Sequence, residues 1–303
     1  MVFQHEGIAH LLHTRRHGTF EDVVLEGEDD GVSSERGADV AYVLFLEPRP
    51  RPDPSWSTGE KCLNWLVRTF QPAPALMHCE LCLPPLPPRE ATRSQFATYQ
   101  GCTSSWMNDR RENERFYLGS GAPTWRAVPV FGIDAAQRIR DECDLEQGVA
   151  YSLARYITAT PPFRVLARAM PAQRRAPAHC ATLTARVLRN ALTNSTAPSH
   201  VAAYYGPSTL YHELCAIAAH RTESMGLRAD ALDDATARSV ETLLRAPMAE
   251  STGALGDAGC AQAVHALTLR ACTDLVGGDA TAQKVSQRQL AQGLLRWVVL
   301  RES

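Results

Sequence analysis

The amino-acid sequence predicts an α+β protein, in which a small, mostly antiparallel sheet packs with helices and an α-helical C-terminal extension follows. Two observations predict this class. In the first half of the chain, short apolar segments typical of strands are separated by turns rich in proline and glycine, in an order that suggests hairpins. After residue 200 the strand signals disappear, alanine becomes frequent, and about four helices are expected between glycine-containing turns.

These features divide the chain into three predicted parts. Residues 1–37 are polar and rich in histidine, acidic residues and glycine, which is typical of a flexible N-terminal segment. We expect residues 38–197 to form the domain that contains the sheet. Residues 198–303 are expected to form the helical extension, and the sequence leaves open whether it packs against that domain.

The individual elements follow from local patterns. Residues 41–48 (AYVLFLEP) are an apolar run that ends in a turn rich in proline and arginine, which predicts a strand. An amphipathic pattern predicts a helix over residues 57–70. Further strands are expected at residues 76–83, 94–101, 115–119 and 124–131. Helices are expected at residues 134–146 and 151–159, and at 209–221 with Ser208 as the N-cap.

Composition excludes several classes of protein. The formal charge of −2 gives no general attraction to nucleic acid or to anionic membranes. There is no run of about 18 apolar residues, so we expect no membrane span. The first residues lack the apolar stretch of a secretory signal. The nine cysteines are scattered and odd in number, which favours the cytoplasm or another reducing intracellular compartment over a disulfide scaffold.

The segment 176–190 (APAHCATLTARVLRN) contains the first candidate site residue. Apolar residues follow Cys180 at helical spacing, and Pro177 suits the start of a helix. Cys180 is therefore expected in or near the first turn, where unpaired backbone N–H groups and the helix dipole favour a thiolate. The alternative is a small buried hydrophobic residue, which is what most free cysteines are.

The predicted strand LMHCELCL, residues 76–83, contains the second candidate. Alternate residues of a strand share a face, so His78 and Glu80 are expected on one face and Cys79 on the other. A histidine beside a thiol can remove its proton and hold the thiolate as an ion pair. Glu80 could orient the imidazole, although side chains two apart on a strand lie roughly 6–7 Å apart. Alternatively, His78 is a polar residue on an edge strand.

A zinc site is a further alternative, because Cys79 and Cys82 have a familiar ligand spacing, with His78, His179 and Cys180 as further ligands. Three positions apart on a strand, however, the two cysteines should point to opposite faces. The sequence also lacks a glycine-rich phosphate-binding loop with a following lysine and serine or threonine. We therefore expect neither a metal nor a cofactor.

The order of these pieces resembles the circularly permuted branch of the NlpC-like, papain-like cysteine hydrolases. That branch includes lecithin:retinol acyltransferase-like enzymes and several bacterial and large-DNA-virus proteins. In it the histidine strand precedes the cysteine helix, as MHCEL precedes HCATLTARVL here. The resemblance covers roughly residues 38 to 195 and implies a permuted papain-like fold, with an origin in a large DNA virus as one possibility.

By this resemblance, Cys180 would be the nucleophile and His78 the general base. The backbone N–H of Cys180 would help to form the oxyanion hole. Tyr151 matches a position that often lines the site near the oxyanion, and the third polar group is expected on a strand after the histidine. The residues expected to line the site or to orient the imidazole are Tyr151, His179, Glu80, Thr98 and Gln100.

The sequence therefore predicts a cysteine peptidase or amidase that acts on a peptide, amide or isopeptide substrate through an acyl-enzyme on Cys180. An acyltransferase of the same superfamily differs only in what resolves the acyl-enzyme. A lipid transferase would be expected to carry an apolar membrane-contacting segment, and none stands out. A different reading is an inactive scaffold with a binding or structural role, in a virion for example, whose C-terminal helices contact a protein partner.

Overall fold

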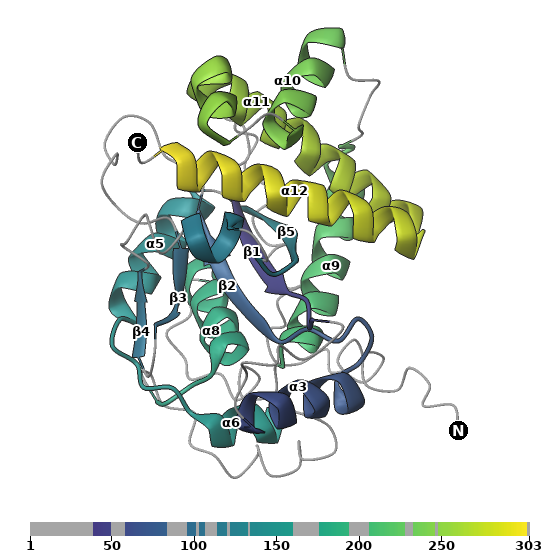
Figure 1. The fold of residues 1–303 in the computed structure, drawn as a ribbon. Helices are drawn as coiled ribbons and strands as arrows, with labels where there is room; N and C mark the ends of the chain where they lie inside the picture. Colours follow the sequence, from purple (N-terminus) through teal and green to yellow (C-terminus); the bar gives the residue numbers. More distant parts are fainter. Residues whose placement is uncertain are drawn as a thin grey trace.

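The computed structural model has the α+β fold that the sequence predicts, with a helical C-terminal region (Figure 1). It describes residues 39–49, 58–83, 96–100, 103–106, 114–119, 122–132, 134–159, 176–193, 206–227, 233–245 and 248–301. The predicted N-terminal segment 1–37 lies outside the described residues.

Within the described residues, one five-stranded sheet has the order β4-β3-β2-β1-β5, and every neighbouring pair is antiparallel. The strands are β1 (Asp39–Leu46), β2 (His78–Cys82), β3 (Phe96–Gln100), β4 (Thr103–Trp106) and β5 (Trp125–Gly132). In the central pair, Leu46 lies opposite His78 and Phe45 opposite Cys79. The pairing of β2 with β3 covers only Leu81 and Cys82.

Strand β1 is an almost continuous apolar run because both of its faces are buried. Val43 and Phe45 belong to the hydrophobic core on one face, and Tyr42 and Leu44 to the core on the other. A strand covered on one side only would alternate apolar and polar residues, as exposed antiparallel sheets do. The sequence of β1 thus already indicates a sheet with helices on both sides.

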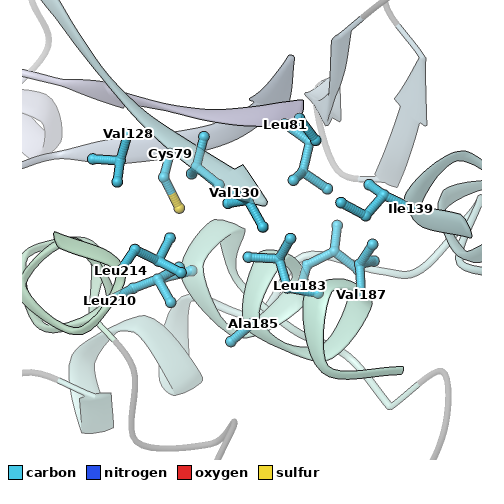
Figure 2. Close-up of a cluster of buried hydrophobic side chains, with 14 of the residues drawn as sticks. Cys79, Leu81, Val128, Val130, Ile139, Leu183, Ala185, Val187, Leu210 and Leu214 are labelled. Atoms are coloured by element: carbon cyan, nitrogen blue, oxygen red, sulfur yellow. The ribbon is translucent and has the colours of Figure 1, made fainter. Parts of the chain in front are cut away.

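The first face of the sheet packs on helices α5 (Ala135–Leu145), α8 (Cys180–Thr193) and α9 (Pro207–Ser224). Figure 2 shows this core, in which strand side chains meet those of the helices. The strand residues labelled there are Cys79, Leu81, Val128 and Val130, and the helix residues include Ile139, Leu183, Val187, Leu210 and Leu214.

The second face packs on the C-terminal helices, and α12 runs across it in Figure 1. These elements are α10 (Asp234–Arg245), α11 (Met248–Gly277) and α12 (Ala280–Arg301), together with a π-helix, η1 (Glu114–Leu118). Helix α9, which follows the boundary expected near residue 197, belongs to the first core, and the later helices contribute mainly to the second. The C-terminal region therefore packs directly on the sheet.

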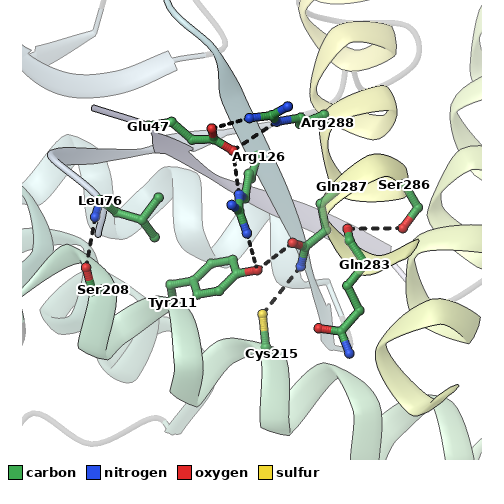
Figure 3. A network of polar contacts seen from close by, with 10 residues as sticks. All are labelled: Glu47, Leu76, Arg126, Ser208, Tyr211, Cys215, Gln283, Ser286, Gln287 and Arg288. Carbon is green, nitrogen blue, oxygen red and sulfur yellow. Dashed lines mark hydrogen bonds and ion pairs between the residues drawn. The ribbon is translucent and has the colours of Figure 1, made fainter. Parts of the chain in front are cut away.

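A polar network joins the sheet to the C-terminal helices (Figure 3). Glu47, just after β1, accepts a hydrogen bond of 2.6 Å from Arg126 Nε on β5 and forms an ion pair with Arg288 on α12. Arg126 also donates to the Tyr211 hydroxyl on α9, which in turn donates to Gln287 on α12. Burial favours such groups only when they are paired, so this network fixes how the helices sit on the sheet.

Two local predictions were wrong, and one strand was missed. Residues 115–119 were expected to form a strand, but Glu114–Leu118 form a π-helix that buries Tyr117 against the second core. Strand β4 was not predicted. Ser208 does not cap α9, because the helix begins at Pro207 with Gly206 as its N-cap, and the Ser208 hydroxyl accepts the Leu76 N–H instead.

Two further helices complete the described fold: α3 (Thr58–Phe70), which precedes β2 in the chain, and α6 (Leu153–Ala159), whose Tyr156 donates to the carbonyl of Met77. None of the helices in the described ranges is long and apolar enough to cross a membrane.

Candidate active site

Cys180 is the first residue of helix α8. The carbonyl of His179 accepts the Leu183 N–H at 2.9 Å, which makes His179 the N-cap residue. The N–H groups of the first helical turn have no partner within their own helix, and the positive end of the helix dipole lies there. The local sequence therefore places the sulfur where a negative charge is favoured.

A short backbone bridge holds the approach to Cys180. Tyr151 and Ala178 form a parallel bridge, in which the Ala178 N–H donates to Ala150 at 3.0 Å and the Ser152 N–H donates to Ala178 at 2.8 Å. This pairing fixes the two residues before Cys180 against the segment that leads into α6. Tyr151, expected from the resemblance near the oxyanion, therefore lies beside the loop that presents the cysteine.

His78 is the first residue of β2 and lies where the strand edge is no longer paired with β3. Its ring makes an edge contact with Trp125, with ring centroids 6.4 Å apart, and its side chain hydrogen-bonds to Cys180. Burial acts to lower the pKa of His78, but the charge of Cys180, that hydrogen bond and the charge of Glu80 together raise it to about 9. The imidazole is thus favoured in its protonated form.

The Cys180 thiol is affected in the complementary direction. A side-chain hydrogen bond with Cys79 is the largest effect and helps to hold the pKa of Cys180 well below its ordinary value. Burial opposes this lowering, while the charge of His78 and hydrogen bonds with His179 and His78 add to it. Cys180 and His78 therefore form a thiolate–imidazolium pair, the state that makes a cysteine nucleophilic.

Cys79 is a site residue that sequence reasoning did not assign. It points from β2 toward α8, and its Sγ lies 3.7 Å from Oγ1 of Thr184, one helical turn after Cys180. Burial, followed by the hydrogen bond with Cys180 and its charge, raises the pKa of Cys79 well above its ordinary value. Cys79 is therefore favoured as a neutral thiol beside Cys180. Strand alternation puts Cys79 on the other face of the sheet from Glu80. This was the feature of the sequence that could have pointed to Cys79 as a site residue.

His179 supplies a second imidazole next to the sulfur. The ring is fully buried, and its Nε2 lies 2.8 Å from Thr182 Oγ1. Because Nε2 is hydrogen-bonded to Thr182, Nδ1 is the ring nitrogen that can interact with Cys180. The position of His179 thus agrees with the expectation that it lines the site.

Tyr156 on α6 connects the two halves of the site and was also missed. Its ring packs edge-on against His179, with centroids 5.4 Å apart, and its hydroxyl donates to the carbonyl of Met77 at 3.4 Å. Burial and then the charge of Cys180 raise the pKa of Tyr156 well above its ordinary value, which keeps the hydroxyl neutral. Tyr156 follows Tyr151 by five positions, and the sequence offers no local signal for choosing between them.

Glu80 does not lie beside Cys180. It is buried on the second face of the sheet, where burial and then the charge of Glu80 raise the pKa of Tyr117 of η1. Strand alternation puts Glu80 on the face opposite to Cys79, and α8 approaches from the face of Cys79. Glu80 affects the site through its charge, which contributes to the raised pKa of His78.

Thr98 and Gln100 lie on β3, the strand next to β2. The pairing of β3 with β2 ends at Ala97, and Thr98 and Gln100 pair with β4 instead. The backbone therefore does not place either residue opposite His78.

The zinc hypothesis meets an obstacle in the sheet. Cys79 belongs to the core on the first face and Cys82 to the core on the second, so the sheet separates the two sulfurs. In the part of the chain that the structure describes, no group of three or more histidine, cysteine or acidic side chains is arranged to hold a metal ion.

Helix α9 holds the segment that leads into β2. Ser208 Oγ accepts the Leu76 N–H at 2.9 Å, and His212 Nε2 lies 2.7 Å from the carbonyl of Ala73. These bonds fix the chain just before His78 and connect the C-terminal region to the site.

Comparison with known proteins adds no family to this picture, because the chain matches no protein-family model and resembles no curated protein or solved structure significantly.

Proposed function

We propose that the protein is a thiol hydrolase of the permuted papain-like type, a peptidase or amidase that acts through an acyl-enzyme on Cys180. The observation that carries this proposal is the pairing of Cys180, at the N-terminus of α8, with the protonated His78 of β2. Such a pair is the minimum for thiol catalysis, and the chemistry is argued from this site alone.

The reaction would proceed in two steps. The Cys180 thiolate attacks the substrate carbonyl, and the oxyanion that forms is positioned for the N–H groups at the start of α8. His78 gives its proton to the leaving amine, which leaves a thioester on Cys180. A water molecule then loses a proton to His78 and attacks the thioester, and Cys180 leaves as a thiolate.

The raised pKa of His78 sets the pH range. A histidine with a pKa of about 9 remains protonated across neutral pH, so it can act as the acid in the first step. We expect acylation to fall as the pH rises through about 9, because His78 then loses the proton that the leaving group needs. The low pKa of Cys180 sets the acidic limit of the same range.

Acyl-enzyme formation tests the proposal directly. The full chain is mixed with p-nitrophenyl acetate, and both the burst of p-nitrophenol and the mass of the Cys180 peptide are followed. We expect stoichiometric acetylation of Cys180 followed by its release, no burst with Cys180→Ala, and a normal burst with Cys62→Ser, which removes an exposed thiol. Equal bursts from wild type and Cys180→Ala would exclude Cys180 as the nucleophile.

The fate of the acyl group separates the two enzyme classes. A hydrolase releases acetate whether or not an amine such as glycine amide is present. An acyltransferase gives the acetylated amine instead, and its acyl-enzyme persists in water alone.

A second candidate is a binding or structural protein that retains this fold without turnover. The observation that favours it is the low exposure of Cys180, whose accessible fraction is 4%. An ordinary thiol reactivity at Cys180, together with the absence of acylation, would support this role over the enzyme.

A further inference from the structure

Two sulfurs from different elements meet in the site. Cys79 comes from β2, and its Sγ lies 3.7 Å from Oγ1 of Thr184. Thr184 and Cys180 are four residues apart on α8 and therefore share one face of the helix, about 5–6 Å apart at Cβ. The Cys79 and Cys180 side chains also hydrogen-bond to each other, and both thiols are free in this structure.

The two sulfurs have opposite chemical characters. Cys180 is favoured as the thiolate and is therefore the sulfur that attacks a peroxide first. Cys79 is held as a neutral thiol, and two of the causes, the hydrogen bond with Cys180 and the Cys180 charge, depend on the Cys180 thiolate. Once Cys180 is oxidised to an uncharged sulfenic acid, these two effects disappear and Cys79 becomes easier to deprotonate.

We propose that Cys79 is a resolving thiol, and that mild oxidation by a hydroperoxide converts Cys79 and Cys180 into a reversible disulfide. In the first step the Cys180 thiolate attacks the O–O bond, giving a sulfenic acid and an alkoxide or hydroxide that takes a proton from His78. In the second step Cys79 attacks the sulfenic sulfur, its proton leaves with the hydroxyl as water, and the S–S bond forms. A dithiol reductant restores both thiols by exchange.

The disulfide would protect the site as well as close it. A sulfenic acid without a neighbouring thiol proceeds to sulfinic and sulfonic acids, which a thiol reductant cannot reverse. With Cys79 in contact, the sulfenic acid is captured first. This inference uses the activated thiolate of the proposed function but not its acyl chemistry, so the two can fail separately.

The strand provides a matched control residue. Cys82 is also buried and also on β2, but it lies in the core of the second face. It is close to Cys79 in sequence and separated from Cys180 by the sheet. A disulfide that depends on contact with Cys180 should therefore need Cys79 and be indifferent to Cys82.

The test uses the full chain, treated with an excess of hydrogen peroxide, because sulfinic acid consumes two equivalents of peroxide and sulfonic acid three, and then alkylated with N-ethylmaleimide under denaturing conditions. Peptide mass spectrometry without reduction should find the Cys79 peptide joined to the Cys180 peptide. Dithiothreitol should return the native protein to its original rate of Cys180 labelling by iodoacetamide. We expect Cys82→Ala to behave like the wild type. In Cys79→Ser, we expect sulfinic and sulfonic acid at Cys180 and at least about ten-fold less recovery of labelling.

Each outcome decides the proposal. Joined Cys79 and Cys180 peptides that disappear with dithiothreitol support it, even if no acyl-enzyme is found in the acetylation experiment. Irreversible oxidation of Cys180 to the same extent in wild type and Cys79→Ser overturns it, as does pairing of Cys180 with another cysteine. Acetylation of Cys180 without any joined peptide overturns the resolving role alone, and a Cys180 inert to peroxide and to p-nitrophenyl acetate overturns both proposals. The wild-type result requires no variant, so a Cys79 variant that fails to fold leaves the test intact.

Discussion

Replacing His78 with alanine should make Cys180 a much weaker nucleophile at neutral pH. Interactions in the folded protein raise the pKa of His78 from 6.5 to about 9, even though burial acts in the other direction. A rise of about 2.5 corresponds to about 3.4 kcal/mol, at 1.36 kcal/mol for each unit of pKa. Coupling between two sites is reciprocal. The part of this energy that comes from the interaction of His78 with Cys180 therefore also stabilises the Cys180 thiolate.

Only part of this energy disappears from Cys180 in the variant. Glu80 contributes to the raised pKa of His78, and the hydrogen bonds of Cys79 and His179 to Cys180 remain when His78 is removed. We therefore expect the pKa of Cys180 to rise in the variant, by less than the about 2.5 by which the pKa of His78 is raised. At a pH below both pKa values, each unit of this rise lowers the thiolate fraction about ten-fold.

The assay is the rate of iodoacetamide labelling of Cys180 between pH 4 and pH 10, followed by peptide mass spectrometry. Cys62 is exposed and serves as the reference thiol in the same samples. His220→Ala, on the exposed side of α9, controls for loss of a histidine elsewhere. Circular dichroism confirms that the variants fold. If the pH midpoint at Cys180 were the same in wild type and His78→Ala, the ion pair would be refuted.

Two further predictions concern how the helices are attached to the sheet. Glu47→Ala leaves the largely buried Arg126 without its carboxylate and should cost about 3 kcal/mol in urea unfolding. Burial acts to raise the pKa of Glu47, but bonds from Arg288 and Arg126 lower it overall. The stability that Glu47 contributes is therefore present above its unfolded pKa and is lost as the pH falls through its pKa in the folded protein. The variant should lose less stability in acid than the wild type. Equal dependence of stability on acid pH in the two proteins would contradict this. A chain that stops at residue 197 exposes the apolar second face of the sheet. It should therefore lack cooperative unfolding and bind a hydrophobic dye. A truncated chain that melts cooperatively as a monomer would contradict this.

Elements with strong local patterns could be predicted from the sequence. The strand of residues 41–48 and the strand that contains His78 are apolar runs bounded by proline-rich turns. The helix that begins at Cys180 has a regular apolar stripe after a proline. In each case the residues that set the local conformation are also the ones that the fold buries, so the local pattern and the tertiary structure agree.

Elements whose conformation depends on distant contacts could not be predicted. The segment ERFYL has aromatic residues that favour strands, yet it forms a π-helix in which Tyr117 packs into the second core and Phe116 remains exposed. Strand β4, TSSW, has no apolar alternation and is a strand because of its pairing with β3. Its Ser104 also bonds to the backbone of Val149, ahead of the bridge that supports the cysteine loop.

In the candidate site, too, some residues follow from local sequence patterns and others depend on distant contacts. The positions of Cys180 and His78 follow from a helix start and a strand, both of which are local features. The choice of neighbours does not, because it depends on which face of β2 the helix α8 covers. Helix α8 covers the face of β2 on which Cys79 lies. Glu80 is on the other face, with Tyr117, and is therefore separated from Cys180.

The support of His78 explains why the C-terminal region belongs to the site as well as to the core. Met77, directly before His78, donates to the carbonyl of Leu46 at 2.9 Å and accepts from Tyr156 at 3.4 Å. Leu76 donates to Ser208 on α9. Three remote segments thus fix the two residues that lead into the histidine, at the point where β2 has no pairing with β3. A strand end held in this way keeps its geometry without pairing to β3, and the histidine that it presents hydrogen-bonds to Cys180.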